Sequence, residues 1–354
     1  DKHVRLDAER SQLFSLCGPG SIEAQLRVAD SIIDNSDDST WYHCADAHFA
    51  RYHAFMQRGD SAAAELALAC YAELAQSRRL RIAGWHVDRL RAQRDLHAGL
   101  LKHAEERFEA LAEQARQLII THWELYYGAQ RSALKRERTG IRRAPVAANA
   151  VMGPHWLEQL PTMRVRRVQY ALKQTESAVA RHELGVLAEG GFAALTSDPF
   201  SLSTLVQLVA PAIALNERQH ARTLCALLEP HADLIALSPF TFSYGSVSQY
   251  LGRLCAYLGR RREARKYLER AIAINARTGH ELERLRSCLA LADLFCDQRG
   301  LQARARSLAT EVRETALQIG SEPLERSAKR LLSRMPAPSS EGRAPRRKSL
   351  RAAP

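Results

Sequence analysis

Glycine residues recur in this sequence at intervals of about 40 residues, and this regularity limits the fold more than any other feature. Gly59, Gly99 and Gly140 are 40 and 41 residues apart, and Gly259 and Gly300 repeat the interval of 41. Self-similarity at a period of roughly 20–50 residues is typical of architectures that stack one supersecondary unit on the next. The sequence therefore predicts a repeat array.

The residues that follow each turn are also alike. A small residue comes five positions later, and in most units a larger apolar residue comes four positions after that. The pairs are Ala64 and Leu68, Ala104 and Phe108, Ala264 and Leu268, Ala305 and the smaller Ala309, and Ala221 and Cys225 after Asn216. Glycine ends a helix because it enters the left-handed conformation at little cost, and the small residue lets the next helix approach closely. Such helical hairpins bury their apolar stripe only by stacking on neighbours.

Composition agrees with a helical array. Ala, Leu, Arg, Glu and Gln, which are common here, are good helix formers, and aromatic residues make up only 6% of the chain. The clearest unit runs over residues 244–277, where both helices fit a tetratricopeptide repeat at Leu251, Gly252, Cys255, Gly259, Ala264, Leu268 and Ala271. Earlier units fit only in their second helix, because Arg51 and Arg91 stand where the first should be apolar. We predict an all-α fold, a tetratricopeptide-like α-α superhelix of six or seven hairpins.

We expect four segments along the chain. Residues 1–137 are predicted to form N-terminal helical hairpin repeats, 138–200 an irregular helical middle with a basic patch, and 201–334 C-terminal tetratricopeptide-like repeats. Residues 335–354 contain few apolar side chains and are predicted to be a disordered basic tail. The chain begins at Asp1 rather than Met, as expected of a processed protein or a piece of a longer one.

Residues 192–320 resemble a known family. The likeness lies in the segments 192–195, 228–233, 244–247, 251–252, 258–259, 271–275, 278–279, 289–293 and 299–300, and looser similarity reaches back to about Thr40 through 137–140. They resemble the C-terminal repeat region of bacterial multidomain regulators that carry an AAA/STAND-type ATPase module, often with a class III adenylate cyclase or a LuxR-type DNA-binding domain. The resemblance implies a region that senses a partner or ligand and restrains the ATPase module.

Three functions stay open at this point. The first is a protein-interaction and regulatory scaffold in a signalling or transcriptional regulator with an upstream ATPase module. The second is a regulatory segment of a class III adenylate cyclase, and the third is a free-standing peptide-binding adaptor. An ATPase module encoded upstream of Asp1 would favour the first two, and a start codon there would favour the third.

Signatures of catalysis are missing from the sequence. It contains no G-x-x-x-x-G-K-[ST] phosphate loop, no G-x-G-x-x-G motif and no H-E-x-x-H motif. Residues His43, Cys44, Asp46, His48 and His53 form the best metal candidate, but only Cys44 and His48 share a helix face, so ordinary helix-face residues are favoured. We therefore predict a non-enzyme with no catalytic residues, no cofactor and no metal site.

The net charge of +12 is concentrated in two segments, residues 131–173 and the tail after Arg334. The first contains a predicted basic patch of Arg138, Arg142, Arg143, Arg164, Arg166 and Arg167. We expect this patch to bind an acidic protein surface. That surface would belong to a separate partner or to the ATPase module of the same parent chain. Nucleic acid is the less favoured partner, because few aromatic or amide side chains accompany these arginines. A solvated helix face is the plain alternative.

The concave face of the array is the expected site for a peptide. Its first helices would present six residues there, namely Arg89, Gln93, His97, Gln249, Arg253 and Tyr257. We expect neither a signal peptide nor a membrane-spanning segment, because the sequence shows no basic-plus-apolar leader and no apolar stretch long enough to cross a bilayer. Seven scattered cysteines without a C-x-x-C pair indicate free thiols in the cytoplasm.

Overall fold

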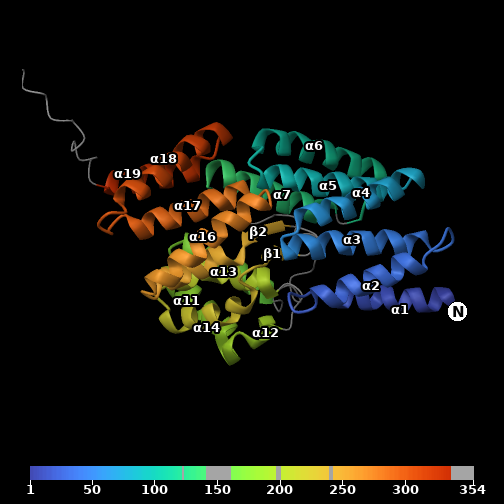
Figure 1. Ribbon diagram of the computed structural model, residues 1–354, viewed down its shortest axis with the longest axis horizontal. Coiled ribbons are helices and arrows are strands. Elements are labelled where there is room, and N and C mark those ends of the chain that lie inside the picture. The colour runs from blue at the N-terminus through green and yellow to red at the C-terminus, as the bar shows by residue number, and fades with distance from the viewer. Residues whose placement is uncertain (122, 141–160, 197–200, 239–241, 336–354) are drawn as a thin grey trace, which may run out of the picture.

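A computed structural model describes residues 1–121, 123–140, 161–196, 201–238 and 242–335 of the chain. Within these ranges the fold is all-α except for one two-stranded β-hairpin, and consecutive helices pack as antiparallel hairpins (Figure 1). The predicted helical repeat superhelix is confirmed. The β-hairpin was not predicted.

The N-terminal half of the molecule consists of helices α1 to α7. Their bounds are α1 Lys2–Ser15, α2 Ile22–Asn35, α3 Trp41–Arg58, α4 Ser61–Ser77, α5 Arg81–His97, α6 Leu101–Leu118 and α7 Trp123–Thr139. Helices α3 and α4 form one hairpin and α5 and α6 the next. Helix α7 continues two residues past the boundary expected at residue 137.

The C-terminal half begins at α10 and contains the β-hairpin. Its elements are α10 Pro161–Lys173, α11 Ser177–Ala188, the 3₁₀ turn Glu189–Gly191, α12 Ala193–Thr196, α13 Ser201–Ala214, α14 Arg218–Leu228, the 3₁₀ turn Glu229–His231, β1 Ile235–Ser238, β2 Phe242–Ser246, α15 Val247–Tyr257, α16 Arg261–Arg277, α17 Glu281–Phe295, α18 Gln302–Ile319 and α19 Glu322–Arg334. The tail expected to be disordered lies, from residue 336, outside the described residues. The predicted segment boundaries stay predictions.

The periodic glycines lie at the turns between or after helices. All five, Gly59, Gly99, Gly140, Gly259 and Gly300, have φ between 75° and 85°. Asn216 has φ of 60° at the equivalent turn. These values are in the left-handed region, which confirms the turn predicted at each position.

The small and large residues after these turns are buried as the repeat pattern predicts. Ala64, Ala104 and Ala264 are fully buried, and Leu68 and Phe108 are at most 2% exposed. Their burial inside each hairpin is the main apolar contribution that holds its two helices together.

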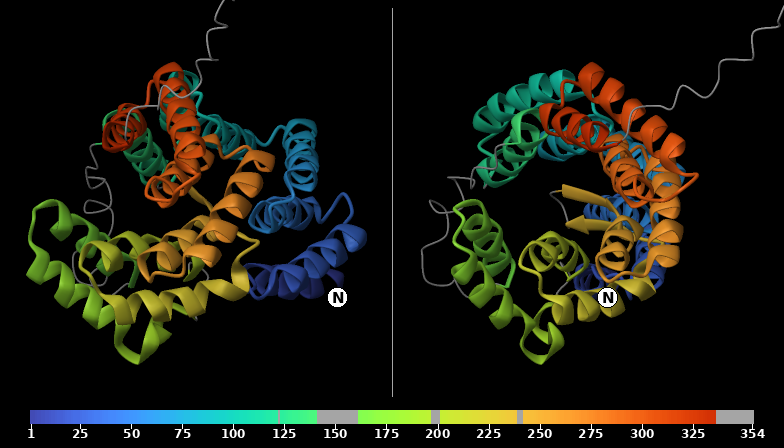
Figure 2. Two further views of the ribbon diagram at one scale, coloured as in Figure 1. Left: turned by 60° about the vertical axis from the view of Figure 1, so that its left-hand side comes forward. Right: turned by 90° about the vertical axis from the view of Figure 1, so that its left-hand side faces the viewer.

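The two halves pack against each other and share an apolar core. Trp85, Leu96 and Phe108 from the N-terminal half form one cluster with Leu285 and Val312 from the C-terminal half. As a result the helices form a ring when viewed as in Figure 2, right.

Strands β1 and β2 lie inside that ring of helices (Figure 2, right). They pair antiparallel, with Leu237 opposite Ser243 and a β-bulge between Ile235 and Leu237. Leu237 packs with the apolar cluster of α3 to α5, Ala236 with that of the C-terminal half, and Phe242 with the shared cluster. The hairpin therefore connects three parts of the core, and we call the helix surface that faces it the inner face.

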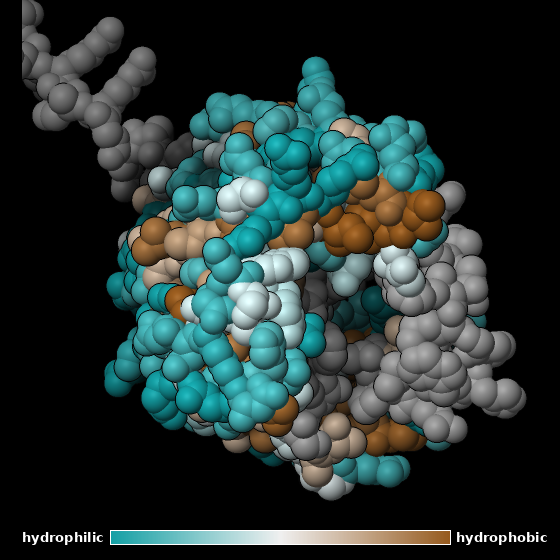
Figure 3. Space-filling view, turned by 90° about the vertical axis from the view of Figure 1, so that its right-hand side faces the viewer, coloured by the Kyte–Doolittle hydropathy of each residue, from teal (hydrophilic) through white to brown (hydrophobic). Residues whose placement is uncertain are grey.

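The outer surface is mainly polar. On the side drawn in Figure 3, hydrophilic residues cover most of the described surface and apolar residues form smaller areas between them. Exposed large apolar side chains in the described ranges include Val4, Leu66, Ile82 and Ile119. No helix in the described ranges has both the length and the apolar character that crossing a membrane requires.

Candidate functional site

The structure corrects one expectation about the six residues predicted on the concave face. They were expected to be presented to a partner, but four of them are buried: Arg89, Gln93, His97 and Gln249 are at most 7% exposed. Arg253 and Tyr257 are half-buried. The chain's own hairpin contacts the inner face at His97, through Ser243, whereas Gln249 is bonded to Glu283 on α17. Whether these residues bind a partner stays a prediction.

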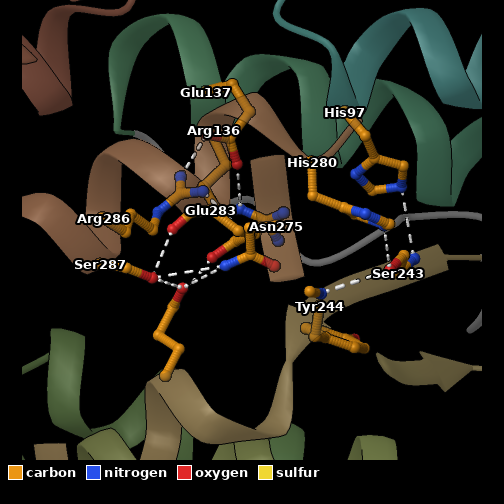
Figure 4. Close-up of polar contacts among 12 residues, drawn as sticks. His97, Arg136, Glu137, Ser243, Tyr244, Asn275, His280, Glu283, Arg286 and Ser287 are labelled. Atoms are coloured by element: carbon orange, nitrogen blue, oxygen red, sulfur yellow. Dashed lines mark hydrogen bonds and ion pairs between the residues drawn. The ribbon is translucent and has the colours of Figure 1, made fainter. Parts of the chain in front are cut away.

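Polar side chains of the helices bind the backbone of the hairpin directly. The amide of Ser243 donates to Nε2 of His97 at 3.4 Å, and the amide of Ser246 donates to Oδ1 of Asn275 at 2.8 Å. The hydroxyl of Tyr250 donates to the carbonyl of Tyr244 at 2.9 Å. Backbone groups that are buried away from water need such partners. Figure 4 shows His97 and His280 reaching Ser243 from above the strand.

A second imidazole extends this arrangement. Oγ of Ser243 lies 2.7 Å from Nε2 of His280, and Oγ1 of Thr278 lies 2.8 Å from Nδ1 of the same ring. Thr278 donates its hydroxyl proton to the carbonyl of Ile274, so Oγ1 accepts from Nδ1 and Nε2 accepts from Ser243. Burial lowers the pKa of His280 to about 4 and that of His97 well below its ordinary value, so both rings are neutral at pH 7.

The Ser243–His280 spacing also occurs in nucleophile and base pairs. Here, however, both residues are 1% exposed, and the group on the far ring nitrogen is a threonine hydroxyl rather than a carboxylate. Ser243 also accepts from the amide of Gly245 at 3.3 Å. We therefore assign the pair to holding the hairpin.

An ionic network joins the two halves beside the hairpin (Figure 4). The carboxylate of Glu137 on α7 contacts Arg136, with Nε at 2.9 Å, and Arg286 on α17. Arg286 also donates to Glu283 at 2.6 Å, and Glu283 accepts from Gln249 at 2.9 Å. Burial alone would raise the pKa of Glu137, but the charges of Arg286 and Arg136 bring it below its ordinary value. This carboxylate is therefore ionised, and it is bonded from both halves.

Asn275 links this network to the strand. Its Nδ2 donates to Oγ of Ser287 at 3.3 Å, while Ser287 donates to Oε1 of Gln249 at 2.8 Å. Gly245 passes close to the same group with φ of 73°, and a Cβ there would lie 2.7 Å from the side chain of Glu283. Glycine is needed at this position for both reasons.

Arg89 lies in an aromatic environment on α5. Its guanidinium is 4.5 Å from the centroid of the Tyr126 ring, and burial lowers its pKa to about 10, against the opposing effects of Tyr126, Tyr52 and Tyr71. A desolvated cation over an aromatic face is a favourable arrangement. Gln93, one turn along α5, is 7% exposed.

The two half-buried residues of the predicted set, Arg253 and Tyr257, lie on α15. Burial lowers the pKa of Arg253. The hydroxyl of Tyr257 donates to Asn216 at 2.6 Å, and its ring lies 5.5 Å from the guanidinium carbon of Arg218. Tyr257 therefore contacts the preceding helical hairpin, α13–α14.

The predicted basic patch is divided between two helices. Arg138 on α7 pairs with Glu105 at 2.6 Å, whereas Arg164 and Arg167 on α10 pair with Glu183 at 3.0 and 3.5 Å. Arg166 is exposed. The remaining members, Arg142 and Arg143, lie outside the described residues. Partner binding by this patch stays a prediction.

An open cavity of about 280 Å³ lies beside the inner face, where the turn after α5 meets the turn between α16 and α17. Its lining includes Met56, Arg91, Arg94, His97, Arg107 and His280. Arg94 pairs with Glu65, and Arg107 pairs with Asp95 at 2.7 Å. Arg91 pairs with Asp88 at 3.5 Å, and Asp95 itself lines the cavity. Each guanidinium therefore has one carboxylate partner already, and its remaining N–H groups are what it would offer to a carboxylate ligand.

The histidine-rich segment of α3 is not arranged as a metal site. Among the described residues, no group of three or more His, Cys, Asp or Glu side chains is placed to hold a metal ion. His43 is fully buried and its Nε2 lies 2.9 Å from Oδ1 of Asp7 on α1.

Sequence reasoning missed the hairpin and the network around it. The signal for β1 and β2 was an apolar run around Ile235 and the alternating Phe242 and Tyr244, on either side of Pro239. No pattern marked Glu137 and Arg286 as partners. No protein-family model matches this sequence, and no curated protein matches it.

Proposed function

We propose that this chain is a protein-interaction and regulatory scaffold, and that its inner face binds an extended segment of a protein by contacts to backbone. One observation carries this proposal. The inner face already holds an extended segment of its own chain, through His97 and Asn275 bonded to backbone amides of Ser243 and Ser246. Bonds to backbone provide affinity in peptide capture, and side-chain pockets provide specificity.

The cavity beside the hairpin supports an acidic partner. Arg91, Arg94 and Arg107 line it, and a peptide carboxylate there would contact guanidinium groups at the edge of the inner face. A partner segment would therefore carry Asp or Glu next to an extended stretch.

The narrower proposal rests on the family resemblance of residues 192–320. In it the chain is the repeat region of a bacterial signalling or transcriptional regulator with an upstream ATPase module. The partner is then the ATPase module of the same parent chain or a separate acidic protein. Binding at the inner face would signal that the partner is present, and the repeats would take part in no catalytic step.

Site-specific photo-cross-linking tests the proposal. A cross-linking amino acid is placed at Arg91 in the cavity, and at Lys102, which is exposed on α6, as the matched control. We expect a discrete protein product from position 91 and not from 102, and its loss in the Arg94→Glu, Arg107→Glu variant. Identical products from both positions, or none from position 91, would contradict the proposal.

A second charge variant separates the two basic surfaces. Arg166→Glu with Arg167→Glu changes α10 and leaves the cavity intact. Loss of the cross-linked product in this variant alone would indicate that the partner docks on α10 and not at the cavity. Recovery of nuclease-sensitive material with a steep salt dependence would instead indicate nucleic acid.

A further inference from the structure

Two cysteines from neighbouring helices face each other away from the inner face. Cys225 on α14 and Cys255 on α15 have their sulfur atoms 4.0 Å apart. A disulfide has a sulfur–sulfur distance of about 2.0 Å, so the two sulfur atoms would have to approach by about 2 Å to form one. The chain between them, residues 226–254, contains the whole β-hairpin.

Cys225 differs from Cys255 because a cavity reaches it. The cavity has a volume of about 280 Å³ and is lined by Arg218, Arg222, Cys225, Ala226, Glu229, Leu258 and Arg260. Cys225 is only 3% exposed, and Cys255 is fully buried behind it. A reagent small enough to enter the cavity therefore meets Cys225 first.

Three arginines give this cavity a positive charge. Arg260 donates from Nη1 to the sulfur of Cys225 at 3.6 Å, and it is also paired with Glu263. Arg218 donates to the carbonyls of Tyr257 and Leu258, both at 3.4 Å. Arg222 is exposed and has no carboxylate in ion-pair distance in the part of the chain that the structure describes.

One carboxylate balances part of this charge. Glu229 lines the cavity and accepts a hydrogen bond from the hydroxyl of Tyr267 at 2.9 Å. The lining therefore suits a molecule with more than one carboxylate, and it also tolerates an ammonium group near Glu229.

The surroundings of the two thiols favour a thiolate at Cys225. A hydrogen bond from Cys255, helped by the charge of Arg260, lowers the pKa of Cys225 to about 7 in spite of burial. The same hydrogen bond and burial raise the pKa of Cys255. The thiolate is the nucleophile in thiol chemistry, so the thiol that is reached by the cavity is also the reactive one.

We propose that Cys225 and Cys255 form a redox site that is oxidised by a small disulfide bearing carboxylates, with Cys225 as the attacking thiol and Cys255 as the resolving thiol. The Cys225 sulfur bonds to one sulfur of the small disulfide and breaks its S–S bond, which releases one small thiolate. The Cys255 thiol then gives up its proton, bonds to the Cys225 sulfur and displaces the second small thiolate. Two protein thiols are oxidised to one disulfide, and the small disulfide is reduced to two thiols.

This chemistry goes beyond the proposed interaction function. An internal disulfide would join α14 to α15, and these two helices flank the segment that carries β1 and β2. The oxidised chain would hold the hairpin on a closed loop, whereas the reduced chain would not. Oxidation by a small disulfide would thereby change how strongly the β-hairpin is held on the inner face.

Two disulfides of opposite charge test the proposal on the unmodified chain. Oxidised glutathione carries carboxylates, and cystamine carries only ammonium groups. We expect oxidised glutathione to react at Cys225 about tenfold faster at low ionic strength, with the advantage falling as salt is added. Mass spectrometry of peptides would detect first the mixed disulfide and then the internal disulfide, which lacks two hydrogens. Equal rates for both reagents, or no internal disulfide, would overturn the proposal.

Variants assign the two roles. Cys255→Ser should accumulate the mixed disulfide at Cys225, and Cys225→Ser should leave Cys255 unmodified. Arg222→Glu, at an exposed position, should remove most of the preference for oxidised glutathione. Mixed disulfide forming on Cys255 in the Cys225→Ser variant would contradict the assignment.

Cys288 is a matched control in the same chain. It accepts from Nη1 of Arg284 at 3.7 Å, much as Cys225 accepts from Arg260, but burial raises its pKa to about 11. We expect it to stay unmodified on the timescale on which Cys225 reacts. Modification of Cys288 as fast as Cys225 would show that a neighbouring arginine alone explains the reactivity, and the redox site would be withdrawn.

Discussion

The hairpins α3–α6 and α15–α18 share the same contacts within each helix pair but differ on the side that faces inward. In both regions the small residue five positions after the turn is fully buried, as at Ala104 and Ala264. The first helices, however, differ at equivalent positions. Five residues before the turn, Leu254 of α15 is fully buried, whereas Arg94 of α5 is only partly buried. The position eight residues before the turn is fully buried as Leu251 and exposed as Arg91.

This difference shows which helix of a repeat unit keeps the same residue pattern from one unit to the next. The second helix packs against its own partner, so its small and large residues are the same wherever the unit lies. The first helix faces whatever occupies the inside of the superhelix. Its composition therefore depends on the neighbours of that unit, which in the N-terminal half are polar and aromatic.

Acid should destabilise α3–α6 more than α15–α18, and this is the largest effect that we expect. The C-terminal region, α15–α18, has one buried histidine of this kind, His280 with a pKa of about 4, whereas the N-terminal region has several. Burial lowers the pKa of His53 on α3 to about 3 and that of His86 on α5 to about 4. The unfolded chain, with a histidine pKa near 6.5, takes up protons first, so the stability contributed by these neutral rings is complete above about pH 6.5 and is lost as pH falls towards 3. The shift of His53 alone corresponds to roughly 5 kcal/mol.

Tryptophan fluorescence follows this loss from the N-terminal side of the molecule. Trp41, Trp85 and Trp123 lie in the N-terminal half, and a Trp156→Phe background removes the remaining indole. On acidification their emission should change at a higher pH than the helical circular dichroism of the whole chain. A single coincident transition would mean that the two regions do not differ in acid stability.

Glu137→Gln should uncouple the two regions. It leaves Arg136 and Arg286 without the buried carboxylate that they share, and breaking a buried pair costs about 3 kcal/mol. The free energy of unfolding in urea is the measurement. Glu105→Gln, which removes the more exposed partner of Arg138, is the control and should cost less than about 0.5 kcal/mol. Equal losses of unfolding free energy in the two variants would mean that the buried carboxylate of Glu137 contributes no more to stability than the exposed pair of Glu105.

A methyl group at a helical glycine should act in opposite directions in the two regions. In α15, a Cβ on Gly252 would lie 2.5 Å from Cγ of Leu268 and 3.2 Å from its amide nitrogen. Gly252→Ala should therefore destabilise the chain by about 2 kcal/mol. In α5, Gly84 has nothing within 4 Å of its Cβ position, so Gly84→Ala should stabilise by roughly 1 kcal/mol. The melting temperatures of both variants measure these changes. A shift in the same direction for both variants would refute the contrast.

A further effect, smaller than that of Gly252→Ala, concerns the attachment of the hairpin to the C-terminal region. Asn275→Ala removes the acceptor for the buried amide of Ser246 and should cost about 1.5 kcal/mol. Hydrogen exchange should show faster exchange at Ser246 and little change in α3 and α4. As control, Asn35→Ala removes an amide that bonds only within its own helix, to Ser31. Unchanged exchange at Ser246 would remove Asn275 from the site.

The sequence was sufficient for the fold class, because local contacts carry the repeat signal. The spacing from Gly259 to Ala264 and Leu268 reflects one turn and one helix pair, and both are set within a few residues. The placement of His97 and Gln249 on the inner face followed from the same register, but their burial did not.

The hairpin and the junction could not be predicted for a different reason. Strands of four and five residues are not stable alone, and β1 and β2 exist because three parts of the helical core enclose them. Glu137 and Arg286 are 149 residues apart, and their contact follows only from how the two halves meet. A single sequence contains no local pattern for either.

The shared apolar core of the two halves has a consequence for biosynthesis. Trp85, Leu96 and Phe108 are buried with Leu285 and Val312, which leave the ribosome much later. Until then the N-terminal helices have no complete surface to pack on, and contacts between residues so distant in sequence form slowly. We infer that the first half of the chain waits in a partly folded state, with its apolar side accessible to chaperones, until α17 and α18 arrive.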